Sequence, residues 1–255
     1  MDQEPRIAVF LDFENLALGV RQAKGPGTFD VELVLKRLLE KGRIVFKRAY
    51  CDWTKYRDDK RTFHTQGIEL VEVPHTKQSG KNSADIHMVV DAVDLCYSKS
   101  HIDIFALVTG DSDFSPLVSK LKENDKRVIG CGVRDSTSNL LLSNCDEFIF
   151  YDDLVTKSAK PKTSARKKGT KKGSNDAIFD QLTEIVASLQ SDYDPLWGSI
   201  VKQTMRRVAP DFNETKYGFK LFSELLEAAE DRGDLVIEYD ENRGNYKIRL
   251  AKGRG

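Results

Sequence analysis

The segment Ile102-Asp103-Ile104-Phe105-Ala106-Leu107-Val108-Thr109 has the apolar centre of a strand buried in a parallel sheet. Gly110-Asp111-Ser112-Asp113-Phe114 follows it directly, so two carboxylates come where the strand is expected to end. A second apolar segment, residues 7–11, is also followed by an acid, Asp12. Sites in open parallel sheets form beyond the carboxyl ends of the strands. If these two strands are neighbours, we expect Asp12, Asp111 and Asp113 to converge.

The rest of the first 156 residues alternates between short apolar runs and helical patterns. Strands are predicted at residues 7–11, 44–51, 68–74, 102–109, 127–133 and 147–151, and helices at 31–41, 55–66, 83–97, 116–124 and 137–143. This alternation is typical of βαβ units. We therefore expect an α/β domain over residues 1–156, with a mostly parallel sheet sandwiched by helices.

A fourth acid, Asp85, stands in the first turn of the helix expected at residues 83–97. Clustered carboxylates repel one another, and some would take up protons unless a cation sat among them. Mg²⁺ or Mn²⁺, which prefer oxygen ligands, would suit such a cluster. The chemistry that this kind of site supports best is phosphodiester hydrolysis, because a metal activates water and neutralises charge on the phosphate.

Each acid also has a purely structural interpretation. Asp12 could simply begin a loop after its strand, and Asp85 could be a first-turn acid favoured by the helix dipole. Asp111 and Asp113 could be an N-cap and a turn residue. Three acids that end two apolar strands favour a site, but spacing alone leaves both interpretations open.

The 255-residue chain has a formal net charge of zero, which argues at first against a nucleic-acid binder. Counted by segment, however, the net charge is −4 for residues 1–156, +8 for residues 157–175 and −4 for residues 176–255. The basic segment is rich in Lys, Ser, Thr and Gly and poor in large apolar side chains, so residues 157–174 are predicted to be a flexible linker. The linker is either a solvated tether or a polycation that neutralises phosphates, and its lack of acids favours the second. The cations proposed to contact RNA are Lys167, Lys168, Lys171 and Lys172.

Residues 175–255 show a different pattern, with helices predicted at 175–189, 200–208 and 220–231 and strands at 235–239 and 246–250. The two strands flank Asn242-Arg243-Gly244-Asn245, which is a hairpin signal. Three helices and a terminal hairpin predict a small winged helix-turn-helix domain. A protein-interaction or dimerisation module is the alternative, and the negative charge argues against tight duplex DNA binding by charge alone.

Four motifs of the first block resemble the NYN family, the LabA-like branch of the PIN nuclease superfamily. They are Phe10-Leu11-Asp12-Phe13-Glu14-Asn15-Leu16, Lys81-Asn82-Ser83-Ala84-Asp85, the run from Val108 to Val118, and the run from Gly130 to Leu140. The resemblance implies a PIN-like α/β sandwich and a divalent-metal nuclease that acts on RNA. By position it implies that Asp12, Asp85, Asp111 and Asp113 are the catalytic and metal-binding acids. It also implies that Asn15 is a polar site residue that holds metal-bound water or phosphate.

The last block resembles the OST-HTH (LOTUS) domain, above all in Lys216-Tyr217-Gly218-Phe219-Lys220-Leu221-Phe222-Ser223-Glu224-Leu225-Leu226. The resemblance implies binding of RNA, with structured, G-rich RNA favoured, or of a protein partner. The candidate phosphate contacts are Arg206, Arg207, Lys216 and Lys220, although surface cations are often merely solvated.

These features together predict a cytoplasmic ribonuclease dependent on Mg²⁺ or Mn²⁺, with RNA recruited by the C-terminal domain. A non-catalytic RNA-binding adaptor with a PIN-like scaffold is one alternative, and a metal phosphohydrolase acting on small nucleotides is another. No apolar run is long enough to span a membrane, and the first residues lack the regions of a signal peptide. The four cysteines form no C-x-x-C pair, so unpaired buried thiols are expected.

Overall fold

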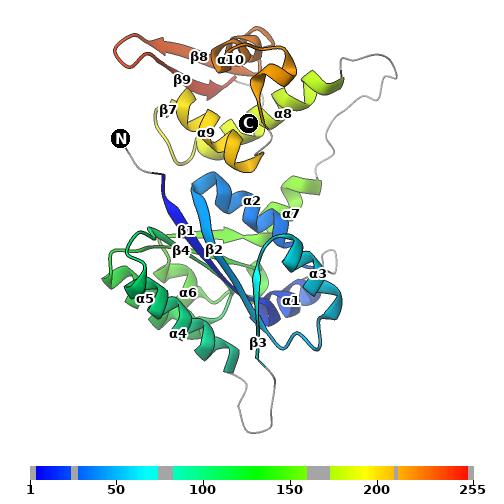
Figure 1. The fold of residues 1–255 in the computed structure, drawn as a ribbon, viewed down its shortest axis with the longest axis vertical. Coiled ribbons are helices and arrows are strands. Elements are labelled where there is room, and N and C mark those ends of the chain that lie inside the picture. Colours follow the sequence, from blue (N-terminus) through cyan, green and yellow to red (C-terminus); the bar gives the residue numbers. More distant parts are fainter. Residues whose placement is uncertain (1–3, 24–27, 74–82, 160–172, 210–211, 252–255) are drawn as a thin grey trace. The chain divides into compact units, whose positions relative to one another are not determined.

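The computed structural model describes residues 4–23, 28–73, 83–159, 173–209 and 212–251. The chain divides into two compact units, Met1–Lys162 and Thr163–Gly255. Figure 1 shows both units as ribbons coloured along the sequence.

The first unit is built on a six-stranded sheet in which every pairing is parallel. Its strands are β1 (Arg6–Asp12), β2 (Arg43–Cys51), β3 (Glu69–Glu72), β4 (Ile104–Val108), β5 (Arg127–Gly132) and β6 (Glu147–Phe150). Their order is β3-β2-β1-β4-β5-β6, so the chain moves outward from β1 to β3 and then returns to place β4 beside β1. The strands at residues 7–11 and 102–109 are therefore neighbours, and the sheet has its topological switch point between them.

Helices cover both faces of this sheet (Figure 1). The elements on one face are α1 (Phe13–Gln22), α2 (Val31–Lys41), α3 (Arg57–Thr65) and α7 (Tyr151–Ala159), and those on the other are α4 (Ser83–Ser98), α5 (Ser115–Glu123) and α6 (Asn139–Asn144). Alternate β1 side chains enter the two cores, with Val9 packed on the α1 side and Phe10 on the α4 side. Burial on both faces explains why the central strands are apolar throughout. The expected α/β class is confirmed.

Two helices of this unit were not predicted from the sequence. The first is α1. Asp12 is both the last residue of β1 and the N-cap of this helix, since its side chain accepts a hydrogen bond from the Asn15 N–H. The second, α7, runs to Ala159, and α8 (Gly173–Leu189) begins the next unit. Both ends of the predicted linker 157–174 are therefore helical, because the helices on either side extend into it. Residues 160–172 lie outside the described residues.

The second unit combines helices with a small antiparallel sheet. Its elements after α8 are β7 (Leu196–Trp197), α9 (Gly198–Val208), the 3₁₀ turn η3 (Glu214–Tyr217), α10 (Phe222–Asp231), β8 (Leu235–Asp240) and β9 (Asn245–Leu250). The sheet order is β7-β9-β8. The three helices and the hairpin lie where the sequence predicts them, whereas β7 and η3 were not predicted. Apolar side chains of α8, α9 and α10 form the core with Leu235 and Ile248 of the hairpin.

Two further expectations concern the whole chain. All four cysteines are unpaired, and three of them are buried. Across the described ranges, no helix combines the length and apolarity needed to cross a membrane.

Candidate active site

The carboxyl ends of β1 and β4 bring the first two acidic segments together. Asp12 is the last residue of β1, and Thr109, Gly110 and Asp111 follow β4 directly. Leu11 pairs with Val108, so Asp12 and Thr109 leave the sheet side by side. Asp12 is only 6% exposed. The convergence that the sequence made conditional on neighbouring strands is therefore present for Asp12 and the Asp111 segment.

A single hydroxyl group joins these two strand ends. The Oγ1 of Thr109 donates a hydrogen bond to Asp12 Oδ2 at 3.0 Å and accepts one from the Asp111 N–H at 3.2 Å. Thr109 is fully buried. The same side chain therefore fixes the orientation of the Asp12 carboxylate and the path of the chain that leads to Asp111.

Asn15 makes a second link across the same gap. Its Oδ1 accepts a hydrogen bond from the Gly110 N–H at 2.9 Å, and its own N–H donates to Asp12 Oδ1 at 3.2 Å. Gly110 is required at this point, because a Cβ there would lie 2.7 Å from the carbonyl oxygen of Ser136. Asn15 is thus a positioning residue whose amide oxygen is already engaged, which leaves its amide nitrogen to meet a ligand.

The structural interpretation is correct for Asp111 and wrong for Asp12, which begins no loop but caps a helix, and capping does not compete with a site. Asp12 is the N-cap of α1, and Asp111 is the N-cap of the 3₁₀ turn η1 (Ser112–Phe114). Asp111 Oδ1 accepts a hydrogen bond from the Asp113 N–H at 3.0 Å, which holds the two acids in one turn. Asp113 itself is exposed. Capping therefore orients the side chains that a site would need.

Asp85 belongs to α4, a helix that is held against the sheet by hydrogen bonds to β2. It lies half-buried in the first turn of α4, and the preceding Lys81 and Asn82 lie outside the described residues. Farther along α4, Asp91 Oδ2 accepts hydrogen bonds from Arg48 Nη1 and Tyr50 Oη, each at 2.7 Å. Because Arg48 and Tyr50 are on β2, these contacts fix the position of α4, and hence of Asp85, on the sheet.

The acids are close enough to act on one another electrostatically. Burial, followed by the negative charge of Asp85, raises the pKa of Asp12 to about 7, although hydrogen bonds from Asn15 and Thr109 oppose the shift. Burial, followed by the charges of Asp111, Asp113 and Glu14, raises the pKa of Asp85 to about 6. All four predicted acids therefore share one electrostatic neighbourhood, and Glu14 is a fifth member that the sequence did not single out.

The donor chemistry of this neighbourhood fits a hard divalent cation. Among the described residues, no three His, Cys, Asp or Glu side chains form a group that could hold a metal ion as they stand. The groups available, however, are carboxylate oxygens, which Mg²⁺ and Mn²⁺ prefer. A bound cation would also relieve the repulsion that raises the pKa values of Asp12 and Asp85.

The predicted RNA-contacting cations fall into two sets. The linker set, Lys167, Lys168, Lys171 and Lys172, lies outside the described residues. In the second unit, Arg206, Lys216 and Lys220 are exposed, whereas Arg207 Nη2 donates a hydrogen bond to Thr204 Oγ1 at 2.7 Å. The sequence did not single out Trp197, which has the Arg243 guanidinium 4.9 Å from its ring centroid.

Several residues that shape the acidic site were also missed. Thr109 was considered only as the last residue of its predicted strand, and Tyr50 and Asp91 were not considered. A usable signal existed for Arg48 and Tyr50, because residues two apart in a strand share one face. Nothing in the sequence indicates that Asp91 contacts Tyr50 and Arg48, because these residues lie 41 and 43 positions away from it.

A parallel sheet between two helical layers, with acids gathered at its switch point, defines an α/β protein with an acidic site at the strand ends. Comparison with known proteins identifies this class more closely. The chain belongs to the NYN domain family, which matches residues 6–152. This family is part of the PIN-like nuclease superfamily, whose members typically use divalent metals, and NYN nuclease domains in general act on RNA.

Two relatives show how far this similarity extends. An uncharacterized protein of Methanocaldococcus jannaschii is 31% identical over 148 residues, which are 57% of this chain and 55% of that protein. The chain thus spans about half the length of that curated relative. The crystal structure of a protein of unknown function from Vibrio parahaemolyticus is similar with a TM-score of 0.53 and 27% identity, covering 60% of this chain and 97% of the other.

Proposed function

We propose that this chain is a divalent-metal-dependent ribonuclease that hydrolyses RNA phosphodiesters at the acidic site. The observation that carries the proposal is the linkage of Asp12 and Asp111 through Thr109 at the switch point of the sheet. In this proposal Asp12, Asp85, Asp111 and Asp113 hold one or two Mg²⁺ or Mn²⁺ ions. A divalent ion bound there would activate water and neutralise charge on the phosphate.

The roles of the protein's own residues follow from their contacts. Thr109 and Asn15 hold the Asp12 carboxylate and the Gly110 backbone in place, so that little reorganisation is needed when substrate arrives. Asp113 is exposed, so a long RNA could reach its carboxylate. The nitrogen of the Asn15 amide can donate a hydrogen bond to a phosphate oxygen, because its oxygen is engaged by Gly110.

The second unit is proposed to recruit RNA as a LOTUS-like winged helix. This is supported by the order of its elements, in which three helices precede the hairpin of β8 and β9. It is also supported by the exposed side chains of Arg206, Lys216 and Lys220, which are suited to phosphate contacts. A cation beside an aromatic ring, as Arg243 lies beside Trp197, is a further feature of surfaces that bind single strands.

The test is cleavage of end-labelled single-stranded and structured RNAs by the full chain, with Mn²⁺, with Mg²⁺ and with a chelator. We expect metal-dependent cleavage that an Asp111→Asn/Asp113→Asn variant loses. The matched control is Asp94→Asn, which makes the same chemical change at an exposed position of α4 outside the acidic site. Equal cleavage by wild type and the double variant would contradict the proposal.

A non-catalytic RNA-binding adaptor is the second candidate. It is favoured by the finding that, in the described part of the chain, the acids do not form a group of three that could hold an ion. The adaptor predicts RNA affinity that falls with salt, without turnover in either metal. Turnover of small nucleotides with RNA left intact would instead indicate a nucleotide phosphohydrolase.

A further inference from the structure

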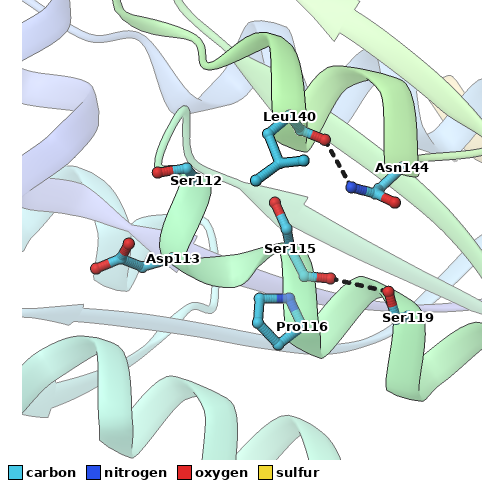
Figure 2. Close-up of a pocket in the computed structure, with 7 residues that line it drawn as sticks. All are labelled: Ser112, Asp113, Ser115, Pro116, Ser119, Leu140 and Asn144. Carbon is cyan, nitrogen blue, oxygen red and sulfur yellow. Dashed lines mark hydrogen bonds between the residues drawn. The ribbon is translucent and has the colours of Figure 1, made fainter.

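A groove of about 580 Å³ opens beside the acidic site, between the start of α5 and the helix α6. Figure 2 shows the side chains that line it, which include Ser112, Asp113, Ser115, Pro116, Leu140 and Asn144. Its volume is in the range of roughly 300–1,000 Å³ that is usual for small-molecule sites. Because Asp113 belongs both to this groove and to the acidic cluster, whatever occupies the groove is adjacent to the proposed site of hydrolysis.

The hydroxyl of Ser115 is the strongest sign that the groove has an occupant. Ser115 is 6% exposed, and its Oγ has no hydrogen-bond partner in the described part of the chain. Figure 2 shows this hydroxyl directed into the space between Ser112 and Leu140 rather than back along its helix. Buried hydroxyls normally have a partner, because desolvation without one is unfavourable. A ligand in the groove would provide it.

Apolar side chains lie near this hydroxyl, and Asp113 is the one charged side chain among the described residues that line the groove. Leu140 is 56% exposed although it is a large apolar side chain, and Pro116 is also exposed. The Asn144 amide donates its Nδ2 to the Leu140 carbonyl at 2.7 Å, which holds this side chain at the edge of the groove. The groove thus offers an apolar contact surface and a hydroxyl within one small space.

This combination fits a nucleobase better than a phosphate. The described residues that line the groove include no lysine or arginine, and Asp113 would repel an anion. Proteins that recognise unpaired RNA bases stack them on aromatic or arginine side chains and form hydrogen bonds with their edges. Here the apolar surfaces of Leu140 and Pro116 would take the place of an aromatic ring. We propose that the groove binds one nucleobase of the RNA strand, next to the phosphate held at the acidic site. The assignment to an RNA strand rests on the proposed function.

The experiment uses the full chain in chelator, so that neither metal nor cleavage contributes. Adenosine, cytidine, guanosine and uridine are titrated separately while the backbone amide signals of Ser112 and Leu117 and the side-chain amide signal of Asn144 are followed by NMR. Ribose 5-phosphate serves as a probe that lacks a base. We expect at least one nucleoside to shift these signals and ribose 5-phosphate to leave them unchanged.

Two variants then test the named contacts. Ser115→Ala and Leu140→Ala are each expected to weaken nucleoside binding by roughly fivefold, the factor expected for the loss of one hydrogen bond or one apolar contact. Ser115→Ala should not lower stability, because it removes a hydroxyl that has no partner. The matched controls are Leu18→Ala, another exposed leucine, on α1, and Ser188→Ala, whose hydroxyl is bonded to the Ile185 carbonyl in the other unit.

The inference is overturned if no nucleoside shifts the groove signals, if ribose 5-phosphate shifts them equally, or if Ser115→Ala binds nucleosides as wild type does. RNA cleavage with Mn²⁺ is measured separately on the same proteins. Cleavage without nucleoside binding would remove the inference and leave the proposed function in place. Nucleoside binding without cleavage of any RNA would remove the proposed function, and of the inference it would leave only a site for a nucleobase.

Discussion

At the scale of single residues, the hydroxyl of Thr109 positions two of the acids. It donates to Asp12 and accepts from the Asp111 N–H, so Thr109→Val would leave both groups without this partner. We expect the free energy of unfolding to fall by about 1–3 kcal/mol, the range for unpaired buried groups. RNA cleavage should fall by roughly tenfold to a hundredfold, because the acids lose their alignment. Urea unfolding and a cleavage assay measure the two effects.

Thr109→Ser is the matched control for this prediction, because it keeps the hydroxyl and removes only the methyl group. It should retain most of the cleavage that Thr109→Val loses. If both variants lose cleavage equally, packing of the methyl group rather than hydrogen bonding is what matters at this position.

Asp12 should destabilise the metal-free protein at neutral and alkaline pH. Burial, and then Asp85, raises its folded-state pKa to about 7 from a value of 3.8, so the folded state holds this proton more tightly than the unfolded state does. Stability is therefore lost as the pH rises from about 4 to 7. In chelator, Asp12→Asn should exceed wild type in stability by up to about 4 kcal/mol at pH 8 and match it near pH 4.

Urea unfolding at the two pH values, with Asp94→Asn as the control, measures this effect. Asp94→Asn should leave the stability difference between pH 4 and pH 8 as it is in wild type. An Asp12→Asn variant that is less stable than wild type at pH 8 would show that the carboxylate is a net stabilising group in the folded protein.

The sequence identifies the acids of the site and fails to identify the residues that orient them. Asp12 and Asp111 could be predicted because a charge directly after an apolar strand breaks the pattern of a buried run. Thr109 and Ser115 could not, because hydroxyls occur throughout the chain and only the folded backbone shows which of them lack or share a partner.

At the scale of elements, the position of α4 depends on its contacts with β2. Tyr50→Phe removes the hydrogen bond to Asp91 but keeps the ring that stacks on Phe10. We expect stability to fall by about 1 kcal/mol and the amides of α4 to exchange faster with solvent. Hydrogen–deuterium exchange measures this directly. Tyr97→Phe, on the same helix, removes only an exposed hydrogen bond of 3.4 Å from Asn124 and should leave exchange nearly unchanged. Equal protection in all three proteins would contradict the prediction.

Most elements were predictable because each shows its own hydrophobic periodicity and is bounded by turn or capping residues, but α1 was not. No turn residue separates it from β1, since Asp12 serves as strand end and helix cap at once. The adjacency of β1 and β4 could only be stated as a condition, because pairing across about a hundred residues leaves no local trace. The linker bounds differed from prediction at both ends because α7 and α8 continue through residues of polar composition.

At the scale of the whole molecule, zero net charge results from cancellation between segments, and the linker cations provide a test of that view. Replacing Lys167, Lys168, Lys171 and Lys172 with Gln should reduce the slope of log affinity against log salt by up to about 3 for single-stranded RNA. The four Lys→Arg replacements, which keep the charge, should preserve the slope. A slope unaffected by the Gln replacements would indicate that the linker is a plain tether.

The hydrogen bond from Thr109 to Asp12 joins residues 97 positions apart, and the one from Gly110 to Asn15 joins residues 95 apart. Asp12 is synthesised long before Thr109, its distant hydrogen-bond partner. A nascent chain that has not yet extruded β4 carries one isolated carboxylate on an unfinished sheet. The acidic site is therefore complete only after about half of the polypeptide has been made, so the order of synthesis leaves the Asp12 carboxylate without the Thr109 hydroxyl until then.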